Sequence, residues 1–209
     1  STPGSGATNT LTVSLTADFD LPVGSTVTIT GLTGSQTADI ASLTVDSTGN
    51  LLGTSGAWGQ STGTLVLTAA SGGTVADNQY VVTFALTNKA GAKSSPAVSV
   101  SAAIEDGLVS VGSIASAAMV KPGAARYGVA TGADPLKVVV PSFTVKSIRQ
   151  STPGSGTDNT LTVSLKADFD LPVGSTVTIM GLTESQTADS ASLAVGSMAG
   201  GLGTSGAWT

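Results

Sequence analysis

The chain has 209 residues and a formal net charge of −5, and its eight Lys and Arg residues are scattered, which argues against nucleic acid or an anionic membrane as a partner. It contains no His and no Cys, so it lacks the usual general base, the commonest metal ligand and any disulfide. Apolar residues make up 40% and charged residues only 10%, so we expect a hydrophobic core under a surface of Ser, Thr, Gly and Asn.

Alternating apolar and polar residues predict a series of strands in the first 120 residues. These strands lie at 10–19, 26–30 and 80–86, with a further one marked by Val98 and Val100, and the short apolar run 65–67 predicts another. Turn-forming segments rich in Gly, Asn, Ser or Pro separate them, at 21–25, 46–50, 71–73 and 88–91. Segment 114–119 is short and rich in Ala and Ser, so we predict a strand or loop there. This spacing predicts an all-β protein, an immunoglobulin-like β-sandwich of about seven strands.

The next strand is predicted at 143–148, after the apolar run 138–140. It continues through the turn-rich segment 151–156 toward a strand that begins near Thr160. We therefore predict three parts. Residues 1–120 form one sandwich repeat, residues 121–135 form a linker, and residues 136–209 form the early strands of a second repeat.

The strongest sequence feature is an internal repeat. Residues 1–58 and 151–208 align without a gap at an offset of 150 residues and differ at twelve of fifty-eight positions. This period fits a whole domain, and such similar copies suggest a longer array. On this reading the first repeat lacks the strand that precedes Ser1, and the second lacks its later strands. Such partial sandwiches expose apolar faces and unpaired edges, so each is expected to need a neighbour, with strand exchange as one way to supply it.

Enzymatic activity is not expected. Segment 59–63, with the sequence GQSTG, matches the nucleophile-elbow pattern Gly-x-Ser-x-Gly. That elbow needs a strand-to-helix turn and a His partner, and the chain has no His. We interpret the segment as a turn.

A weak candidate for a metal site is the pair Asp18 and Asp20, which recurs as Asp168 and Asp170. Carboxylates one residue apart at the end of a strand can bind Ca²⁺, which takes six to eight oxygen ligands. The alternative is that these residues cap turns at a solvated edge. No other cofactor is expected.

Aromatic residues supply the candidate interface. Trp58 and Trp208 follow the same Thr-Ser-Gly-Ala run in both copies. A Trp at this place suits an interface anchor or a sugar-stacking platform, with core or inter-domain packing as the alternative. Tyr127 lies in the predicted linker, where little local core surrounds it, and is a candidate contact between units. Phe143 and Val145, on the strand at the repeat boundary, complete the predicted interface.

Three segments carry a family resemblance: TVKSIRQSTP at 144–153, NTLTVSL at 159–165 and GSTVTIMGLTESQTAD at 174–189. They resemble repeats in very large proteins of unicellular algae and other protists. This resemblance implies tandem immunoglobulin-like domains in an extracellular or surface fibre, without a catalytic residue. We therefore expect a structural subunit that assembles with itself end to end outside the cell, with glycans attached or bound. The alternative is an adhesin stalk or head that binds glycans or another cell surface.

Overall fold

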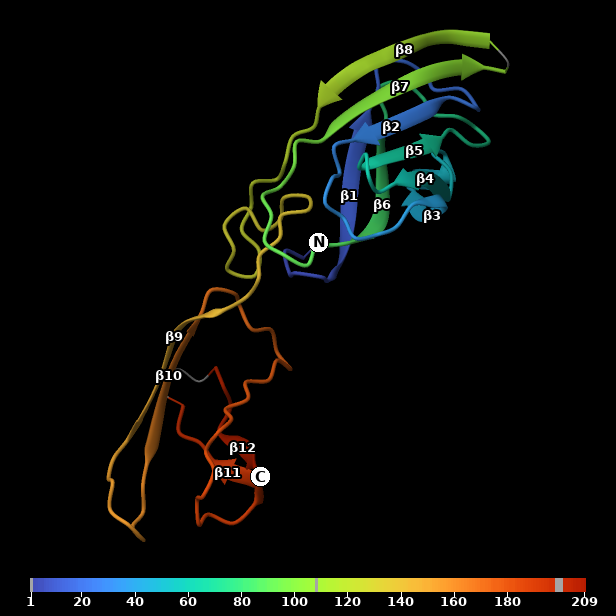
Figure 1. Ribbon diagram of the computed structural model, residues 1–209. Coiled ribbons are helices and arrows are strands. Elements are labelled where there is room, and N and C mark those ends of the chain that lie inside the picture. The colour runs from blue at the N-terminus through green and yellow to red at the C-terminus, as the bar shows by residue number, and fades with distance from the viewer. Residues whose placement is uncertain (1, 108, 198–200) are drawn as a thin grey trace. The chain divides into compact units, whose positions relative to one another are not determined.

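The computed structural model describes residues 2–107, 109–197 and 201–209, and its regular elements are almost entirely β-strands (Figure 1). The all-β class predicted from the sequence is confirmed. The chain divides into two compact units, Ser1–Leu171 and Pro172–Thr209. Among the described elements, no helix is long and apolar enough to span a membrane.

The described residues of the first unit form ten strands and one short 3₁₀ turn, η1 (Thr48–Asn50). The strands are β1 (Thr8–Thr16), β2 (Thr26–Thr30), β3 (Ile40–Ser47), β4 (Ser55–Gly59), β5 (Thr64–Thr68), β6 (Gln79–Thr87), β7 (Ser99–Asp106), β8 (Val109–Ala118), β9 (Phe143–Gln150) and β10 (Leu161–Ala167). The second unit contains β11 (Ser190–Ala194) and β12 (Ser205–Trp208), which pair with each other.

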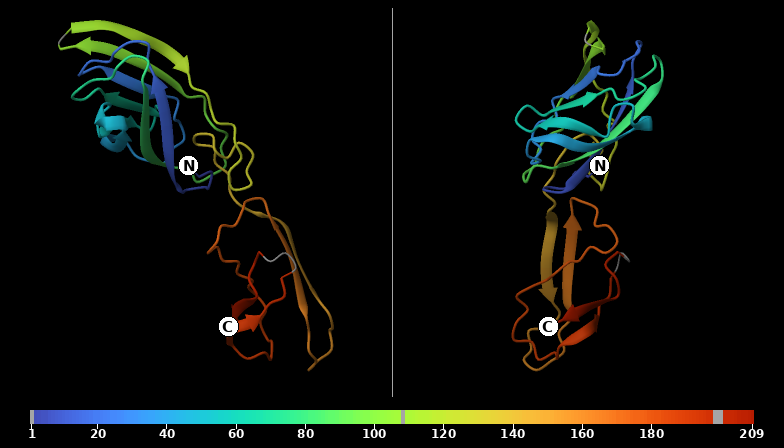
Figure 2. Two further views of the ribbon diagram at one scale, coloured as in Figure 1. Left: turned by 180° about the vertical axis from the view of Figure 1, so that it is seen from behind. Right: turned by 90° about the vertical axis from the view of Figure 1, so that its right-hand side faces the viewer.

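Eight strands form one antiparallel sheet in the order β1-β6-β3-β4-β5-β2-β7-β8. Strand β3 turns the corner of this sheet, because residues 40–44 pair with β4 whereas residues 45–47 pair with β6. The sheet therefore curls into two layers, and β1 and β6 run across the remaining strands (Figures 1 and 2). Strands β1 and β8 are the two ends of the strand order.

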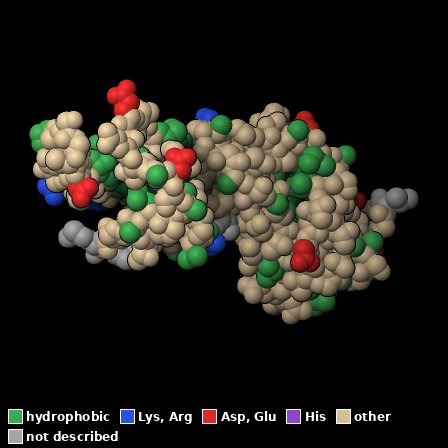
Figure 3. All heavy atoms as spheres, turned by 90° about the horizontal axis from the view of Figure 1, so that it is seen from below, with side chains coloured by type: hydrophobic (Ala, Val, Ile, Leu, Met, Phe, Trp, Pro, Cys, Tyr) green, Lys and Arg blue, Asp and Glu red, His purple; other side chains and the backbone are tan. Residues whose placement is uncertain are grey.

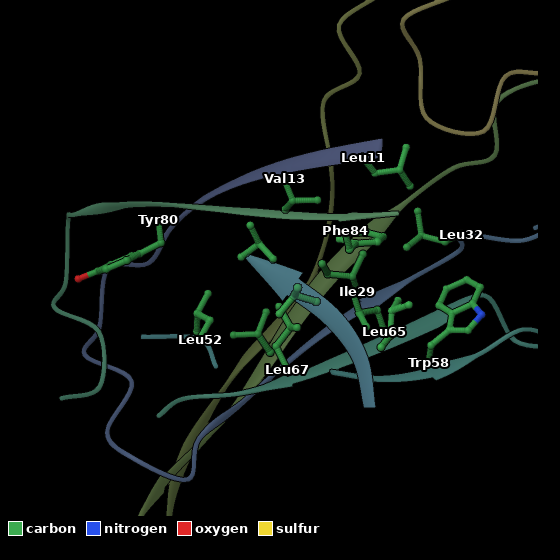
Figure 4. Packing of buried hydrophobic residues seen from close by; sticks show 14 of the residues in the cluster. Leu11, Val13, Ile29, Leu32, Leu52, Trp58, Leu65, Leu67, Tyr80 and Phe84 are labelled. Carbon is green, nitrogen blue, oxygen red and sulfur yellow. The ribbon is translucent and has the colours of Figure 1, made fainter. Parts of the chain in front are cut away.

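The hydrophobic core lies between these two layers. On β1 the odd positions Leu11 and Val13 point inward, and on β5 Leu65 and Leu67 are completely buried. Figure 4 shows side chains from both layers pointing toward one another, with Trp58 at one end of the cluster. Period-two alternation therefore predicted the buried face of β1 correctly.

A buried amide pair closes one end of the curled sheet. The side chains of Asn9 and Asn88 are 1% and 0% exposed, and the Nδ2 of Asn9 donates to the Oδ1 of Asn88 over 2.9 Å. Asn88 in turn donates to the carbonyls of Thr2 and Gly4, each over 2.8 Å. The segment that enters β1 is thus fixed to the segment that leaves β6 by hydrogen bonds shielded from water.

Residues after the predicted linker also pack in the first unit. Leu136 and Val138 are each 1% exposed, and Val138 exchanges two backbone hydrogen bonds with Lys93. Val139 pairs with the segment around Gly4. The structural division lies between Leu171 and Pro172, whereas the repeat boundary predicted at 136 is defined by sequence, and it stays a prediction.

The surface carries few charges. Figure 3 shows one face on which Lys, Arg, Asp and Glu side chains are few and scattered among uncharged ones. Some of the exposed apolar side chains lie at an edge of the curled sheet. On β8, Val109 and Val111 are 65% and 53% exposed, and Val120 just beyond it is 97% exposed.

Candidate interface at strand β1

Strand β1 has one unpaired edge among the described residues. Its other edge pairs with β6 along its whole length. The carbonyls of Ala7 and Ala17, at odd positions, accept hydrogen bonds from Asn88 and Asp77 on the β6 side. Because backbone groups of successive residues alternate between the two edges of a strand, the even positions of β1 direct their backbone groups toward the outer edge, away from β6.

In the second repeat, the equivalent edge is occupied. Strand β10 corresponds to β1 at the 150-residue offset, and it pairs with β9, with Leu161 opposite Gln150 and Val163 opposite Ile148. The carbonyls that face β9 belong to even positions, since Thr160 accepts from the backbone N–H of Ser151 and Lys166 from the hydroxyl of Thr144. Strand β9 therefore uses the edge of β10 that corresponds to the outer edge of β1.

Two grooves lie beside the outer half of β1. The smaller groove has a volume of about 280 Å³. One wall is formed by residues 15–18, at the end of β1 and in the turn that follows it, and the other by Val100 and Ala102 of β7 and Ile114 of β8. The other has a volume of about 340 Å³ and is lined by residues 10–13 together with Met119 and parts of the following segment. Apolar side chains of the two sheet layers thus border a space beside an unpaired strand.

The turn after β10 holds the start of β9 by an Asp side chain. The carboxylate of Asp168 accepts hydrogen bonds from both the backbone N–H and the hydroxyl of Ser142, each over 2.7 Å. These two donors, the backbone N–H first, lower the pKa of Asp168 below its ordinary value. The backbone N–H of Asp168 also donates to the carbonyl of Ser142 over 3.0 Å.

The same turn contacts Tyr127. Residues Arg126 and Val129 exchange two backbone hydrogen bonds, so Tyr127 and Gly128 form a two-residue hairpin loop with φ of +50° and +72°. The ring of Tyr127 stacks on Phe169, with centroids 5.3 Å apart and planes inclined by 13°. Its carbonyl accepts from the backbone N–H of Asp170 over 3.0 Å.

This loop conformation is costly for Tyr127, because a side chain at positive φ is strained by about 1–3 kcal/mol. The following position favours glycine because its φ is +72°, and a Cβ there would also lie 2.8 Å from the Oδ1 of Asp170, which would have to move. The guanidinium of Arg126 lies 5.4 Å from the centroid of the Tyr127 ring. The hairpin thus stacks the Tyr127 ring on Phe169 while its backbone hydrogen-bonds to the backbone of Asp170.

In the first repeat the corresponding turn has no such contacts among the described residues. Asp18, Phe19 and Asp20 correspond to positions 168–170. The Phe19 side chain is 49% exposed, and Asp18 is exposed beside the smaller groove. Asp20 accepts a 2.7 Å hydrogen bond from the backbone N–H of Ala76, within its own repeat.

Asp18, Asp20, Asp168 and Asp170 were the predicted calcium ligands. Among the described residues, no three acidic side chains come together as a metal-binding group. Asp20 accepts from the backbone N–H of Ala76 and Asp168 from that of Ser142, which lie 56 and 26 residues away in the chain. The calcium site stays a prediction.

The two Trp residues differ in burial. Trp58 is 3% exposed in the core, and its indole N–H donates to the carbonyl of Thr37 over 2.9 Å. This favours the core alternative over the predicted interface role for Trp58. Trp208 makes the corresponding hydrogen bond to Thr187 over 3.1 Å, but its ring is half-buried.

The remaining predicted interface residues lie on β9 and in the segment before it. Phe143 is half-buried, and Val145 and Ile148 are 44% and 50% exposed. The sequence did not single out Ser142 or Phe169 as contact residues. The repeat alignment could have drawn attention to Phe169, because Phe19 and Phe169 are conserved between the two copies at the end of a predicted strand.

A scan against protein-family models, a search of curated proteins and a search of solved structures each found no match to this chain.

Proposed function

We propose that this chain is a structural subunit of an extracellular filament or surface fibre, which assembles end to end through immunoglobulin-like β-sandwich repeats. One observation carries the proposal. The outer edge of β1 is unpaired among the described residues, whereas the sequence-equivalent edge of β10 pairs with β9. Unpaired edges beside apolar grooves favour addition of a further strand.

The composition supports the same function. The chain has no His, few charges and closely similar tandem copies, which suits a repeated building block better than a catalytic domain. The adhesin alternative depended on two candidate binding sites, Trp58 and the pair Asp18 and Asp20. Trp58 is only 3% exposed, so its ring offers no platform for a sugar. The adhesin alternative then depends on Asp18 and Asp20 alone.

The direct test is electron microscopy of the 209-residue chain over a series of concentrations, together with sedimentation velocity on the same samples. Regular filaments with an axial repeat of one domain length, or a multiple of it, are the expected result. A single species with the mass of one chain at every concentration, with no filaments on the grid, would rule the proposal out.

A further inference from the structure

We infer that the outer edge of β1 and the turn at residues 18–20 form an acceptor site for segment 126–150 of a second copy of this chain, with β9 docked antiparallel on β1. This inference rests on the proposed end-to-end assembly and names the surfaces that would meet. The chain itself shows the contact once, because segment 126–150 already lies on β10 and on the turn at 168–170.

The first argument is the identity of the two acceptor strands. Strands β1 and β10 differ within residues 11–17 only at Thr16, where the second copy has Lys166. The edge that β9 uses on β10 corresponds to the outer edge of β1, as the hydrogen bonds accepted by the carbonyls of Thr160 and Lys166 establish. The backbone N–H and C=O groups by which β10 pairs with β9 therefore have equivalents on the outer edge of β1.

The register follows from the pairing in the second repeat. Thr162 lies opposite Arg149 and Ser164 opposite Ser147, so the 150-residue offset places Thr12 opposite Arg149 in the second copy. Ile148 then falls opposite Val13, which points into the core, and paired residues project from the same face of a sheet. An exposed Ile side chain of β9 is thereby brought to the apolar groove that residues 10–13 border.

The other end of β9 reaches the smaller groove. Phe143 lies opposite Ala167 after a register shift, so it falls opposite Ala17, which borders that groove together with Leu21. Lys146 falls opposite Leu15, next to the exposed Asp18, so its aliphatic stem covers the groove while its ammonium stays in water. Docking would thus place the exposed apolar side chains of β9 against the apolar grooves beside β1.

The second argument is independent of the strands and concerns the turn. Two contacts that residues 168–170 make with segment 126–142 have open counterparts, at residues 18 and 19. Phe19 is the exposed counterpart of Phe169, on which Tyr127 stacks, and Asp18 is the counterpart of the carboxylate that holds Ser142. A second copy that docks β9 on β1 would bring its own Tyr127 hairpin to Phe19.

Paired proline variants test the strand contact in the full chain. The N–H of Ser14 points to the outer edge, so Ser14→Pro blocks strand addition without removing a β1–β6 hydrogen bond, and proline is tolerated on such edges. Its counterpart Ser164→Pro weakens the β9–β10 pairing and frees β9. We expect Ser14→Pro to abolish assembly and Ser164→Pro to increase it. Circular dichroism and thermal melts check that both variants fold.

A cysteine experiment tests the register, because the chain has no Cys of its own. A Thr12→Cys chain mixed with an Arg149→Cys chain should form a mixed disulfide dimer, since directly opposed strand residues lie about 5.5 Å apart at Cα, within disulfide reach. A Ser14→Cys chain mixed with the same Arg149→Cys chain is the out-of-register control and should cross-link at least several-fold less. Equal yields would overturn the inferred register.

A labelled peptide of residues 126–150 separates this inference from the proposed function. Binding to the full chain should fall about tenfold or more in Asp18→Asn, through loss of a charged hydrogen-bond acceptor, and be abolished in Ser14→Pro. Peptide binding with this pattern by a chain that stays monomeric supports the inference and rejects the filament. Filaments that form equally well with Ser14→Pro reject the inference and keep the filament.

Discussion

The carboxylate of Asp168 accepts two 2.7 Å hydrogen bonds from Ser142, and so ties the turn after β10 to the residue just before β9. The pKa of Asp168 is lowered because both donors favour the charged carboxylate. A carboxyl group whose pKa falls on folding stabilises the folded state above its unfolded pKa, and this contribution is lost as the pH falls through the folded pKa. The hold on Ser142 is therefore expected to fail only in acid.

The first prediction concerns that titration. Ser142→Ala removes the hydroxyl donor but keeps the backbone N–H, so the pKa of Asp168 should rise part of the way toward its ordinary value. Carboxyl carbon-13 NMR over a pH series measures the change directly. The pKa of Asp168 staying where it is in the variant would mean that the hydroxyl contact is not formed in solution.

The second prediction concerns the two Trp residues. Trp58→Ala empties a core site and should lower the free energy of unfolding by about 3–5 kcal/mol. Trp208→Ala, at the equivalent but half-buried position, should have a clearly smaller effect on the same transition. Urea titration followed by circular dichroism measures both without depending on Trp fluorescence. Equal losses would contradict the burial of Trp58.

The third prediction concerns the buried amide pair. Asn88→Ala leaves the side chain of Asn9 and the carbonyls of Thr2 and Gly4 without their partner, at a cost of about 2 kcal/mol or more. Asn159→Ala serves as an exposed control, because Asn159 corresponds to Asn9 of the pair and its hydrogen bonds with Ser151, Thr152 and Gln150 are all exposed. We expect the control to change the unfolding free energy little, as measured by the same urea titration.

The fourth prediction uses two glycines with the same conformation. Gly31 and Gly181 are equivalent in the repeat and have φ of +87° and +86°. A Cβ on Gly31 would lie 2.1 Å from the carbonyl oxygen of Ala97, whereas nothing lies within 4 Å of one on Gly181. Gly31→Ala should therefore destabilise the fold well beyond the backbone strain that both variants share. Thermal melting of the two variants tests this, and equal shifts would contradict it.

The sequence predicted some strands better than others for a definite reason. Strands β2, β5 and β6 bury one face, so their alternation is clean. Strand β3 was missed because a register shift between Ile40 and Leu43 interrupts its alternation. Strand β4 was missed because its sequence, SGAWG, has one large side chain and therefore shows no alternation.

The candidate interface was only partly accessible from the sequence. The repeat offset located a strand ahead of the β1-type strand, and the segment 143–148 is indeed paired with β10. The stacking of Tyr127 on Phe169 joins residues far apart in the chain through a strained two-residue loop. No local pattern encodes such a contact, because it depends on how the segment between residues 127 and 169 folds back.

Strand β9 pairs with β10, and the inferred docking would place it on the equivalent edge of β1 in another chain. Every transfer of β9 between chains fills one edge and vacates another. Strand β10 has an advantage over β1 of another chain, because it belongs to the same chain as β9. Its effective concentration toward β9 is near the millimolar range. Assembly by this route is consequently a competition between a chain and its neighbour, and it should be reversible and sensitive to small changes in the stability of the β9–β10 pair.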